Sequence, residues 1–225
     1  MKVSVLMCVH NEREEYLKDS IRSILTQTLT DFELLICIDG PWQENLRTVN
    51  YFCDKRIKLF VNKKSMGLTK SLNKLWGKAK GKYIARLDSH DLSHPTRLEK
   101  QYNYMQKHKD IYVLGCRPRF INKKGKHILR LTTPNFIIPW MVKLAHKFTN
   151  QFIHSALFIR NRQGLRYLEY YYYCQDYELT SRLLSPKCHN HKGNNLFQKL
   201  VSYRIHENNK KSSQDRYTKL IKETY

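Results

Sequence analysis

The sequence predicts an α/β fold, in which one mainly parallel sheet is flanked by helices in a single domain. Short apolar runs alternate with segments of helical periodicity from residue 2 to about 119, as in successive βαβ units. The chain has 225 residues, which is long enough for one sizeable core. We find no Gly/Ser/Pro-rich linker and no internal repeat, so one compact domain is favoured over two.

The elements of the first half follow in order from their apolar patterns. Residues 2–9 are apolar and lack a small-residue cleavage site, so we interpret them as a first strand and not as a leader. Leu17, Ile21 and Ile24 recur at helical spacing, and the run 32–38 predicts a second buried strand. The other expected elements are a strand at 57–61, a helix with Leu68 to Ala79 on one face that ends at Gly81, a strand at 83–87, a helix opened by Pro95 and a strand at 111–116.

The second half carries weaker signals. Gly125 indicates a hairpin turn, and residues 136–144 have the pattern of an amphipathic helix. A short strand at 156–159 and a helix at 177–184 follow. The polar, basic tail from 208 to 225 is compatible with either a frayed end or a helix.

Charge and cysteine usage narrow the function classes. Lys plus Arg is 41 against 19 for Asp plus Glu, a net charge of +22, which attracts phosphates, nucleic acid or an anionic membrane. The lysines are scattered and no nucleic-acid-binding motif is present, so no specific nucleic acid is expected, although a basic nucleic-acid-binding protein remains the alternative. No apolar run approaches the roughly 18 residues that cross a bilayer. The six cysteines form no CxxC pair, which favours a reducing cytoplasm.

Polar clusters follow the expected strands at 10–12, 39–41 and 86–91. Ligands of open parallel sheets bind beyond the carboxyl ends of the strands, so these clusters should converge on one crevice. Within the last cluster, Asp88, His90 and Asp91 can offer oxygen and nitrogen ligands to a divalent cation that clamps a diphosphate. The alternative is structural, with Asp88 capping a turn and Asp91 capping the following helix.

Several spaced motifs resemble one enzyme family. Residues 2–39 (KVSVLMCVHNEREEYLKDSIRSILTQTLTDFELLICID) resemble the opening of family 2 glycosyltransferases, which have the GT-A fold, a Rossmann-like α/β architecture. Residues 62–73 and 81–101 are similar to the central block of that family, and the later landmarks are 153–155, 175–179 and 203–206. The sequence Asp39-Gly40-Pro41 is similar to bacterial galactosyl- and glucosyltransferases that build capsular and extracellular polysaccharide.

The resemblance implies transfer of a hexose from a nucleotide-sugar, most often a UDP-sugar, to a hydroxyl of a glycan or lipid-linked glycan. It implies inversion at the anomeric carbon and a role in surface polysaccharide biosynthesis. On this basis residues 1–119 form the nucleotide-sugar-binding half, and 120–207 form the acceptor-binding and catalytic-base half of the same domain. Residues 208–225 form the basic tail.

The resemblance also assigns nucleotide-binding roles to individual residues. Asp39 matches the carboxylate that accepts the uracil imide hydrogen, or else it forms an Asx turn. His10, Asn11 and Glu12 match the loop over the nucleoside, where His10 stacks on uracil or lies in a simple surface turn. Asp88 and Arg86 are the remaining candidates for contact with the nucleotide. Arg86 either faces the nucleotide or pairs with an acid across the sheet.

A divalent metal is the implied cofactor. Asp88 and His90 occupy the first and third positions of the Asp-x-Asp motif of the family, so an imidazole stands where a carboxylate is usual. Because Mg²⁺ prefers oxygen ligands, we expect Mn²⁺ over Mg²⁺. Asp91 can rotate in as a substitute. His206 matches a late histidine that completes the metal site in related enzymes, or else residues 203–206 are simply the end of a strand.

Asp176 is the expected catalytic base, because inversion needs a carboxylate opposite the leaving diphosphate. Gln175 replaces the acid that usually precedes it. Helix capping by Asp176 is the structural alternative, and Glu178 is the reserve base. The changes at His90 and Gln175 keep open a catalytically silent relative of these enzymes.

The predicted helix at 136–144 carries a candidate membrane-facing side. It combines apolar residues with flanking lysines, namely Phe136, Ile137, Ile138, Trp140, Met141 and Leu144 beside Lys143 and Lys147. Such a face either dips into an anionic membrane interface, as suits a lipid-linked acceptor, or packs into the core. The expected location is therefore cytoplasmic, with peripheral attachment to the membrane as a hypothesis.

Overall fold

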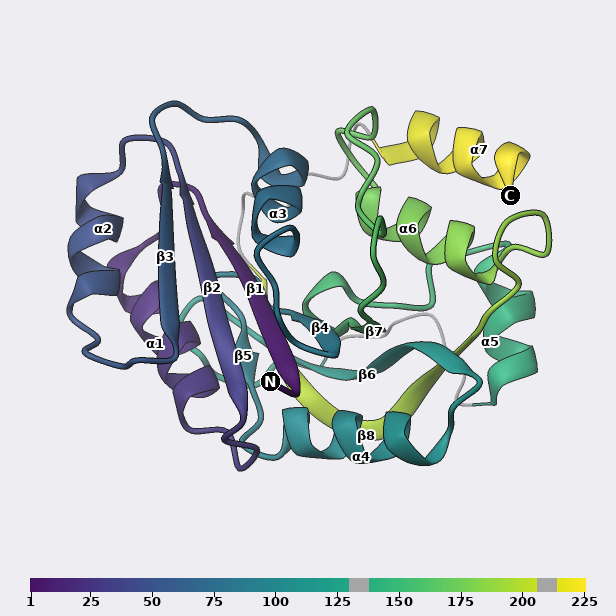
Figure 1. The fold of residues 1–225 in the computed structure, drawn as a ribbon, viewed down its shortest axis with the longest axis horizontal. Helices are drawn as coiled ribbons and strands as arrows, with labels where there is room; N and C mark the ends of the chain where they lie inside the picture. Colours follow the sequence, from purple (N-terminus) through teal and green to yellow (C-terminus); the bar gives the residue numbers. More distant parts are fainter. Residues whose placement is uncertain (130–137, 206–213) are drawn as a thin grey trace.

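The computed structural model describes residues 1–129, 138–205 and 214–225, and it has one eight-stranded sheet with helices on both faces (Figure 1). The strand order is β3-β2-β1-β4-β7-β6-β8-β5. The strands are β1 (Val3–Val9), β2 (Phe32–Asp39), β3 (Ile57–Asn62), β4 (Tyr83–Arg86), β5 (Leu92–Ser93), β6 (Ile111–Ile121), β7 (Phe158–Arg160) and β8 (Lys192–Arg204). The helices are α1 (Glu14–Leu25), α2 (Gln43–Asn50), α3 (Leu68–Trp76), α4 (Arg97–Lys107), α5 (Pro139–His146), α6 (Gln175–Leu184) and α7 (Gln214–Thr224), with a 3-10 turn at His154–Ala156.

Parallel pairing dominates the half of the sheet that carries the predicted strand ends. The strands β3, β2, β1 and β4 are neighbours in parallel, with Val3 opposite Phe32 and Val9 opposite Ile38. The strand β7 is antiparallel to β4 and β6, while β6 and β8 are again parallel. The expected architecture of a mainly parallel sheet between helices in a single domain is confirmed.

Two cores lie on opposite faces of this sheet, because successive side chains of a strand point to opposite sides. On β1, Val5 and Met7 pack in the core that includes α1, α2 and α4. The intervening Leu6 and Cys8 pack in the core that includes α3 and α6. Burial on both faces explains why β1 and β2 are continuously apolar in sequence.

The helix α3 ends at Trp76, so the prediction that Gly81 stops it was wrong. Gly81 has a different role, because a Cβ there would lie 2.4 Å from the backbone nitrogen of Ser4. Its N–H also donates to Ser4 Oγ at 2.8 Å. Gly81 is therefore needed for close approach to β1 at the start of β4.

Other boundaries and elements also differ from the sequence analysis. The helix α2 and the strand β5 were not predicted, and β8 was foreseen only at its end. The strand β6 continues to Ile121, and β7 starts at Phe158 because the 3-10 turn occupies the residues before it. The turn at Gly125 is confirmed, since its φ is +75° and Ile121 bridges to His127.

The tail contains the helix α7, which packs on the second half of the chain. Ile221 is buried against Tyr171 and Tyr177. All six cysteines are free thiols. Within the described residues, no helix has the length and hydropathy needed to span a membrane.

Candidate functional site

The predicted convergence of polar strand ends is confirmed by a cleft of about 560 Å³. Its walls come from the ends of β1 and β2, from the loop 65–67 and the first turn of α3, from the loop 88–90, and from the segment before α6. The predicted site residues that line it are His10, Asn11, Glu12, Asp39, Asp88 and His90. Arg86 and Asp176 do not line it, and His206 lies outside the described residues.

Asp39 holds one wall of the cleft together. Its Oδ1 accepts hydrogen bonds from Asn62 Nδ2, Ser71 Oγ and the Met66 N–H, and its Oδ2 accepts them from Ser65 Oγ and the Gly67 N–H, at 2.8–3.0 Å. Burial raises the pKa of Asp39, but these hydrogen bonds outweigh burial and hold the pKa below its ordinary value. These partners lie 23–32 positions away in the chain, so the side chain does not form the alternative Asx turn.

The loop after β1 places His10 and Asn11 at the mouth of the cleft. His10 Nδ1 lies 3.0 Å from the carbonyl oxygen of Asp39, and the ring packs edge-on against Trp42 at 5.2 Å. Asn11 has a φ of +47°, a left-handed conformation that asparagine tolerates better than most residues. The exposed imidazole is therefore fixed beside Asp39, where it can meet a planar ligand.

Glu12 ties the β1 loop to the loop that carries the metal candidates. Its Oε2 accepts hydrogen bonds from Ser89 Oγ at 2.8 Å and His90 Nδ1 at 3.0 Å. Asn45, on α2, fixes its backbone by accepting the Glu12 N–H and donating to the Glu12 carbonyl. Burial raises the pKa of Glu12, while His90 and Ser89 lower it below the ordinary value. Asn45 was missed because its helix was not predicted.

Arg86 lies beneath Asp88 and pairs with it, so it contacts the acid on its own strand end and does not line the cleft. Ser155 completes the clamp on Asp88, donating to Oδ2 at 2.7 Å and accepting the Asp88 N–H at 3.1 Å. Burial raises the pKa of Asp88, but the charge of Arg86 and the Ser155 hydrogen bond help to hold it well below its usual range. Asp88 is therefore ionised and fixed in orientation.

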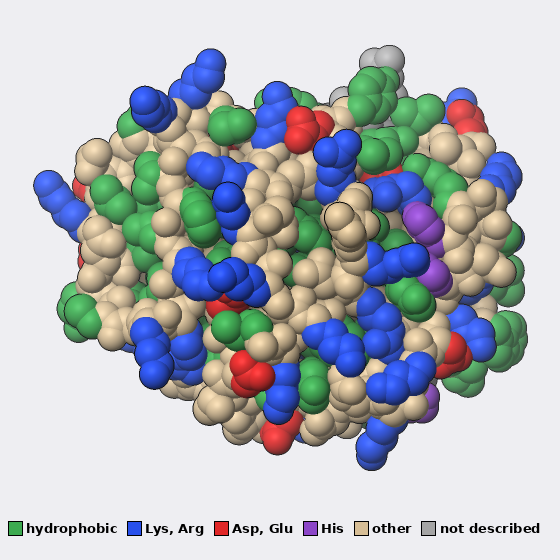
Figure 2. Space-filling view, in the orientation of Figure 1, with side chains coloured by type: hydrophobic (Ala, Val, Ile, Leu, Met, Phe, Trp, Pro, Cys, Tyr) green, Lys and Arg blue, Asp and Glu red, His purple; other side chains and the backbone are tan. Residues whose placement is uncertain are grey.

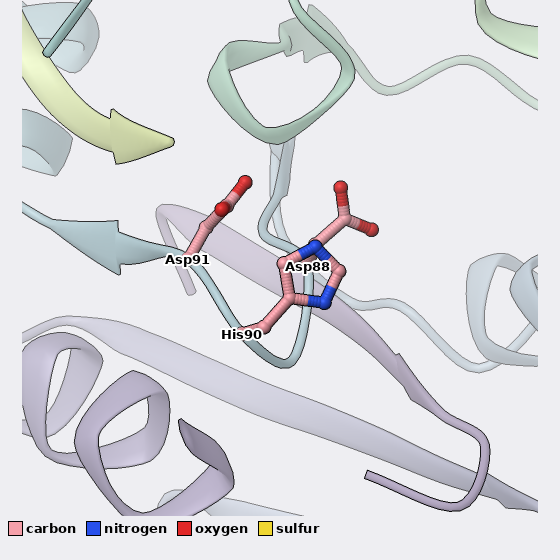
Figure 3. Close-up of side chains that lie close together, drawn as sticks. All are labelled: Asp88, His90 and Asp91. Carbon is pink, nitrogen blue, oxygen red and sulfur yellow. The ribbon is translucent and has the colours of Figure 1, made fainter. Parts of the chain in front are cut away.

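Asp88, His90 and Asp91 project from one loop and lie close together (Figure 3). One potential ligand atom from each lies within 4.8 Å of the other two. Asp91 is fully buried, and its Oδ1 accepts the Arg204 N–H at 2.7 Å, so it does not cap α4. Its Oδ2 is buried and accepts no hydrogen bond from the described part of the chain, and burial raises the pKa of Asp91 to about 6. A cation bound there would stabilise the ionised carboxylate. The donor set therefore fits a divalent cation.

The Glu12 contact also selects the tautomer of His90. Because an ionised carboxylate only accepts hydrogen bonds, Nδ1 of His90 must be the donor, and Nε2 is the nitrogen that can ligate a metal. Burial lowers the pKa of His90, but Glu12, Asp91 and Asp88 together raise it to about 9. Cation binding through Nε2 must then release a proton.

Asp176 and Glu178, the two base candidates, lie in the first turn of α6 and differ in their contacts. Asp176 is partly exposed, and its Oδ2 accepts a hydrogen bond from Asn150 Nδ2 at 2.9 Å. Glu178 is fully buried, and its carboxylate is bonded to Arg182 and to the Tyr225 hydroxyl. The carboxylate of Glu178 is therefore occupied by structural contacts, whereas the partly exposed carboxylate of Asp176 is accessible to a ligand.

His154, in the 3-10 turn, interacts electrostatically with both Asp88 and Asp176. Burial and the charge of Arg86 lower the pKa of His154, while Asp176 and Asp88 both raise it. Its Nε2 is 2.9 Å from the hydroxyl of Tyr167. Two carboxylates from different elements thus act electrostatically on the same half-buried histidine.

The tyrosine-rich segment before α6 divides between packing and the cleft. Tyr167 and Tyr171 are buried, whereas Tyr172 and Tyr173 line the cleft. Tyr172 is 71% exposed, so its ring is open to a ligand in the cleft.

Comparison with known proteins decides the family. The sequence profile described as "Glycosyl transferase family 2" matches residues 4–168, which is more than half of the chain. The chain belongs to glycosyl transferase family 2.

Relatives and solved structures of this family agree with the match. The O-antigen biosynthesis glycosyltransferase WbnJ of Escherichia coli is 35% identical over 221 residues, which cover 94% of this chain and 82% of WbnJ. The uncharacterized glycosyltransferase MJ1057 of Methanocaldococcus jannaschii is 33% identical over 208 residues, covering 90% and 70%. The structure of S. aureus TarS 1–349 in complex with UDP-GlcNAc superposes with a TM-score of 0.76 at 17% identity, covering 95% of this chain and 61% of that one. The chain thus spans about three fifths of the TarS fragment and shares its GT-A fold.

The family match covers only part of the candidate site. Asp39, Asp88 and His90 lie within residues 4–168, whereas Asp176 and α6 lie beyond them.

Proposed function

We propose that this chain is an inverting glycosyltransferase that moves a hexose from a UDP-sugar to a hydroxyl of a glycan or lipid-linked glycan. The observation that carries the proposal is one cleft in which Asp39 and the candidate metal ligands Asp88 and His90 face the same space. The names of WbnJ, for O-antigen biosynthesis, and of TarS, with UDP and UDP-GlcNAc, support a role in surface polysaccharide synthesis and a uridine nucleotide donor.

The nucleoside is proposed to bind between the β1 loop and Asp39. Ser65 is exposed, and its hydroxyl can turn away from Asp39 Oδ2 to make room for the uracil imide hydrogen. His10 would stack on the base, and Asn11 and Glu12 would form the loop around it. Arg86 acts on the nucleotide only through Asp88, whose carboxylate it orients.

Asp88, His90 and Asp91 would hold the metal, with His206 as a further proposed ligand. The mixed oxygen and nitrogen donors favour Mn²⁺ over Mg²⁺. When bound, such a cation stabilises the negative charge that develops on the leaving diphosphate. Glu12 orients His90 in the way that carboxylates orient metal-binding histidines, so replacement of the usual aspartate does not by itself remove the site.

Asp176 is proposed as the base. The acceptor oxygen attacks the anomeric carbon from the side opposite the diphosphate, the bond to the diphosphate breaks, and Asp176 takes the hydroxyl proton. Asn150 orients the carboxylate for this transfer. We also propose a cytoplasmic location, which the six free cysteines support.

Thermal unfolding with UDP, with and without Mn²⁺ or Mg²⁺, tests the donor site. A ligand that binds only the folded state stabilises it by about 2.7 kcal/mol at a hundredfold excess over its dissociation constant. We expect a shift that needs UDP and Mn²⁺ together and that disappears in Asp88→Ala. An equal shift with inorganic phosphate, or none with UDP, would refute the proposal and favour a general polyanion-binding protein.

A further inference from the structure

The helix α5 and the residue pair that follows it expose an apolar stripe. Val142 and His146 face inward and are buried. On the other side, Trp140, Leu144 and Phe148 recur at intervals of four and are 66%, 51% and 69% exposed. Core packing, the alternative considered for this helix, therefore does not account for the stripe. Figure 2 shows hydrophobic side chains at the edge of the molecule where α5 lies in Figure 1.

A basic pocket adjoins this stripe. The helices α5, α6 and α7 surround a cavity of about 270 Å³ whose apolar wall includes Leu184 and Ile221. No aspartate or glutamate is among its lining residues, whereas four lysines are, namely Lys143, Lys147, Lys187 and Lys222.

These lysines lack acidic partners in the described ranges that form the pocket. Lys143 Nζ donates to Asn190 Oδ1 at 2.5 Å, and Lys187 Nζ lies 3.5 Å from the carbonyl oxygen of Thr224. Burial lowers the pKa of Lys143, and the charge of Lys147 lowers it further. An anion in the pocket would relieve this repulsion.

We infer that this end of the molecule docks on an anionic lipid bilayer, with the stripe in the interface and a lipid phosphate in the lysine pocket. Tryptophan and phenylalanine beside lysines are the combination found on helices that lie in a membrane interface. Free phosphate would use the lysines but leave Trp140, Leu144 and Phe148 without a partner. The net charge of +22 adds long-range attraction to the same surface.

The location of the pocket links docking to the proposed chemistry. Asp176 lies in the first turn of α6, and Leu184, at the other end, lines the pocket. A rise of ~1.5 Å per residue separates them by about 12 Å along the helix. Docking therefore holds the proposed base within reach of a lipid-linked acceptor; this last step rests on the proposed function, whereas membrane binding itself does not.

Flotation of the full chain with vesicles tests the docking surface. The vesicles are phosphatidylcholine alone or with about one third phosphatidylglycerol. The charge variant is Lys147→Glu/Lys222→Glu, and its control is Arg47→Glu/Lys55→Glu, which makes the same charge change around α2 at the opposite end of the molecule (Figure 1). The apolar variant is Phe148→Ser, and its control is Tyr51→Ser, because Tyr51 is 65% exposed on the α2 side.

We expect the chain to float with the anionic vesicles and not with pure phosphatidylcholine. Each lysine near an anionic surface contributes about fivefold in affinity, so the charge variant should bind at least about 25-fold more weakly, while its control loses far less. Phe148→Ser should weaken binding at high salt, where Tyr51→Ser does not. No flotation of the unaltered chain, equal binding by variants and controls, or displacement by millimolar inorganic phosphate alone would overturn the inference. Because flotation requires no turnover, its failure is separate from failure of the glycosyltransferase proposal.

Discussion

Replacement of Asp39 by Asn separates base recognition from folding. The carboxylate accepts five hydrogen bonds, three at Oδ1 and two at Oδ2. In Asp39→Asn the new NH₂ group should take the Oδ2 position, because fewer donors are displaced there. The hydroxyl of Ser65 can reverse and accept from it, but the N–H of Gly67 cannot.

The structure sets the size of the effect. One buried backbone N–H that is left without an acceptor lowers the free energy of unfolding by roughly 1–3 kcal/mol. In a chain of this size each kcal/mol lowers Tm by about 2–4 °C, so Asp39→Asn should melt about 2–12 °C lower but still fold. The NH₂ group would also face the proposed position of the uracil imide N–H, so two donors would meet, and UDP affinity should fall by about tenfold or more.

Calorimetric titration with UDP and CDP gives the readout, because cytosine lacks the imide hydrogen. The unaltered chain should prefer UDP, and Asp39→Asn should lose this preference. Ser65→Ala is the matched control, since it frees Oδ2 without adding a donor and should bind UDP at least as tightly as the unaltered chain. Unchanged preference for UDP in Asp39→Asn, or weakened UDP binding in Ser65→Ala, would refute this account of the base site.

Three further predictions concern the metal loop, acid stability and the base. Ser155→Ala should weaken Mn²⁺ binding by about 10–100-fold in a metal titration, because Asp88 loses its clamp, whereas unchanged affinity would contradict the clamp. Burial lowers the pKa of His146 from 6.5 to about 3. Between pH 6.5 and about 3 the unfolded chain therefore binds a proton at this histidine that the folded chain does not bind. The free energy of unfolding should fall as the pH drops through this range, by at most about 1.4 kcal/mol per pH unit. Denaturant titrations of His146→Gln should show a flatter pH dependence there, and an unaltered slope would count against it. Asp176→Asn should lower turnover by about 10²–10⁴-fold without changing UDP affinity. Glu178→Gln should lower Tm and retain turnover. The reverse pattern would make Glu178 the base and Asp176 the structural residue.

The sheet and the cleft were predictable because their signals are local. Buried parallel strands leave continuous apolar runs, and polar residues at their ends mark one edge of the sheet. The role of Gly81 was not predictable in this way, because its close approach to Ser4 exists only once β1 and β4 pair. Sequence shows a glycine but not the strand that lies against it.

The partners of the site residues were harder to predict than the residues themselves. Asn45 fixes Glu12 from a helix that the periodicity did not indicate, and Arg204 holds Asp91 from 113 positions away. These contacts use single side chains or backbone groups, so they leave no periodic signal in the sequence. Only the assembled sheet brings them together.

The histidine in the metal motif is best understood through these partners. Taken alone, His90 in place of an aspartate indicates a weakened site, since it removes one negative charge. Glu12 restores a carboxylate 3.0 Å away, behind the imidazole, and Arg204 donates to both the His90 carbonyl and Asp91. The loop therefore presents a fixed nitrogen as the proposed ligand, and Glu12, after the end of β1, supplies the negative charge that a histidine lacks at this position. A change at Glu12 should consequently disturb the metal site as much as a change at His90 itself.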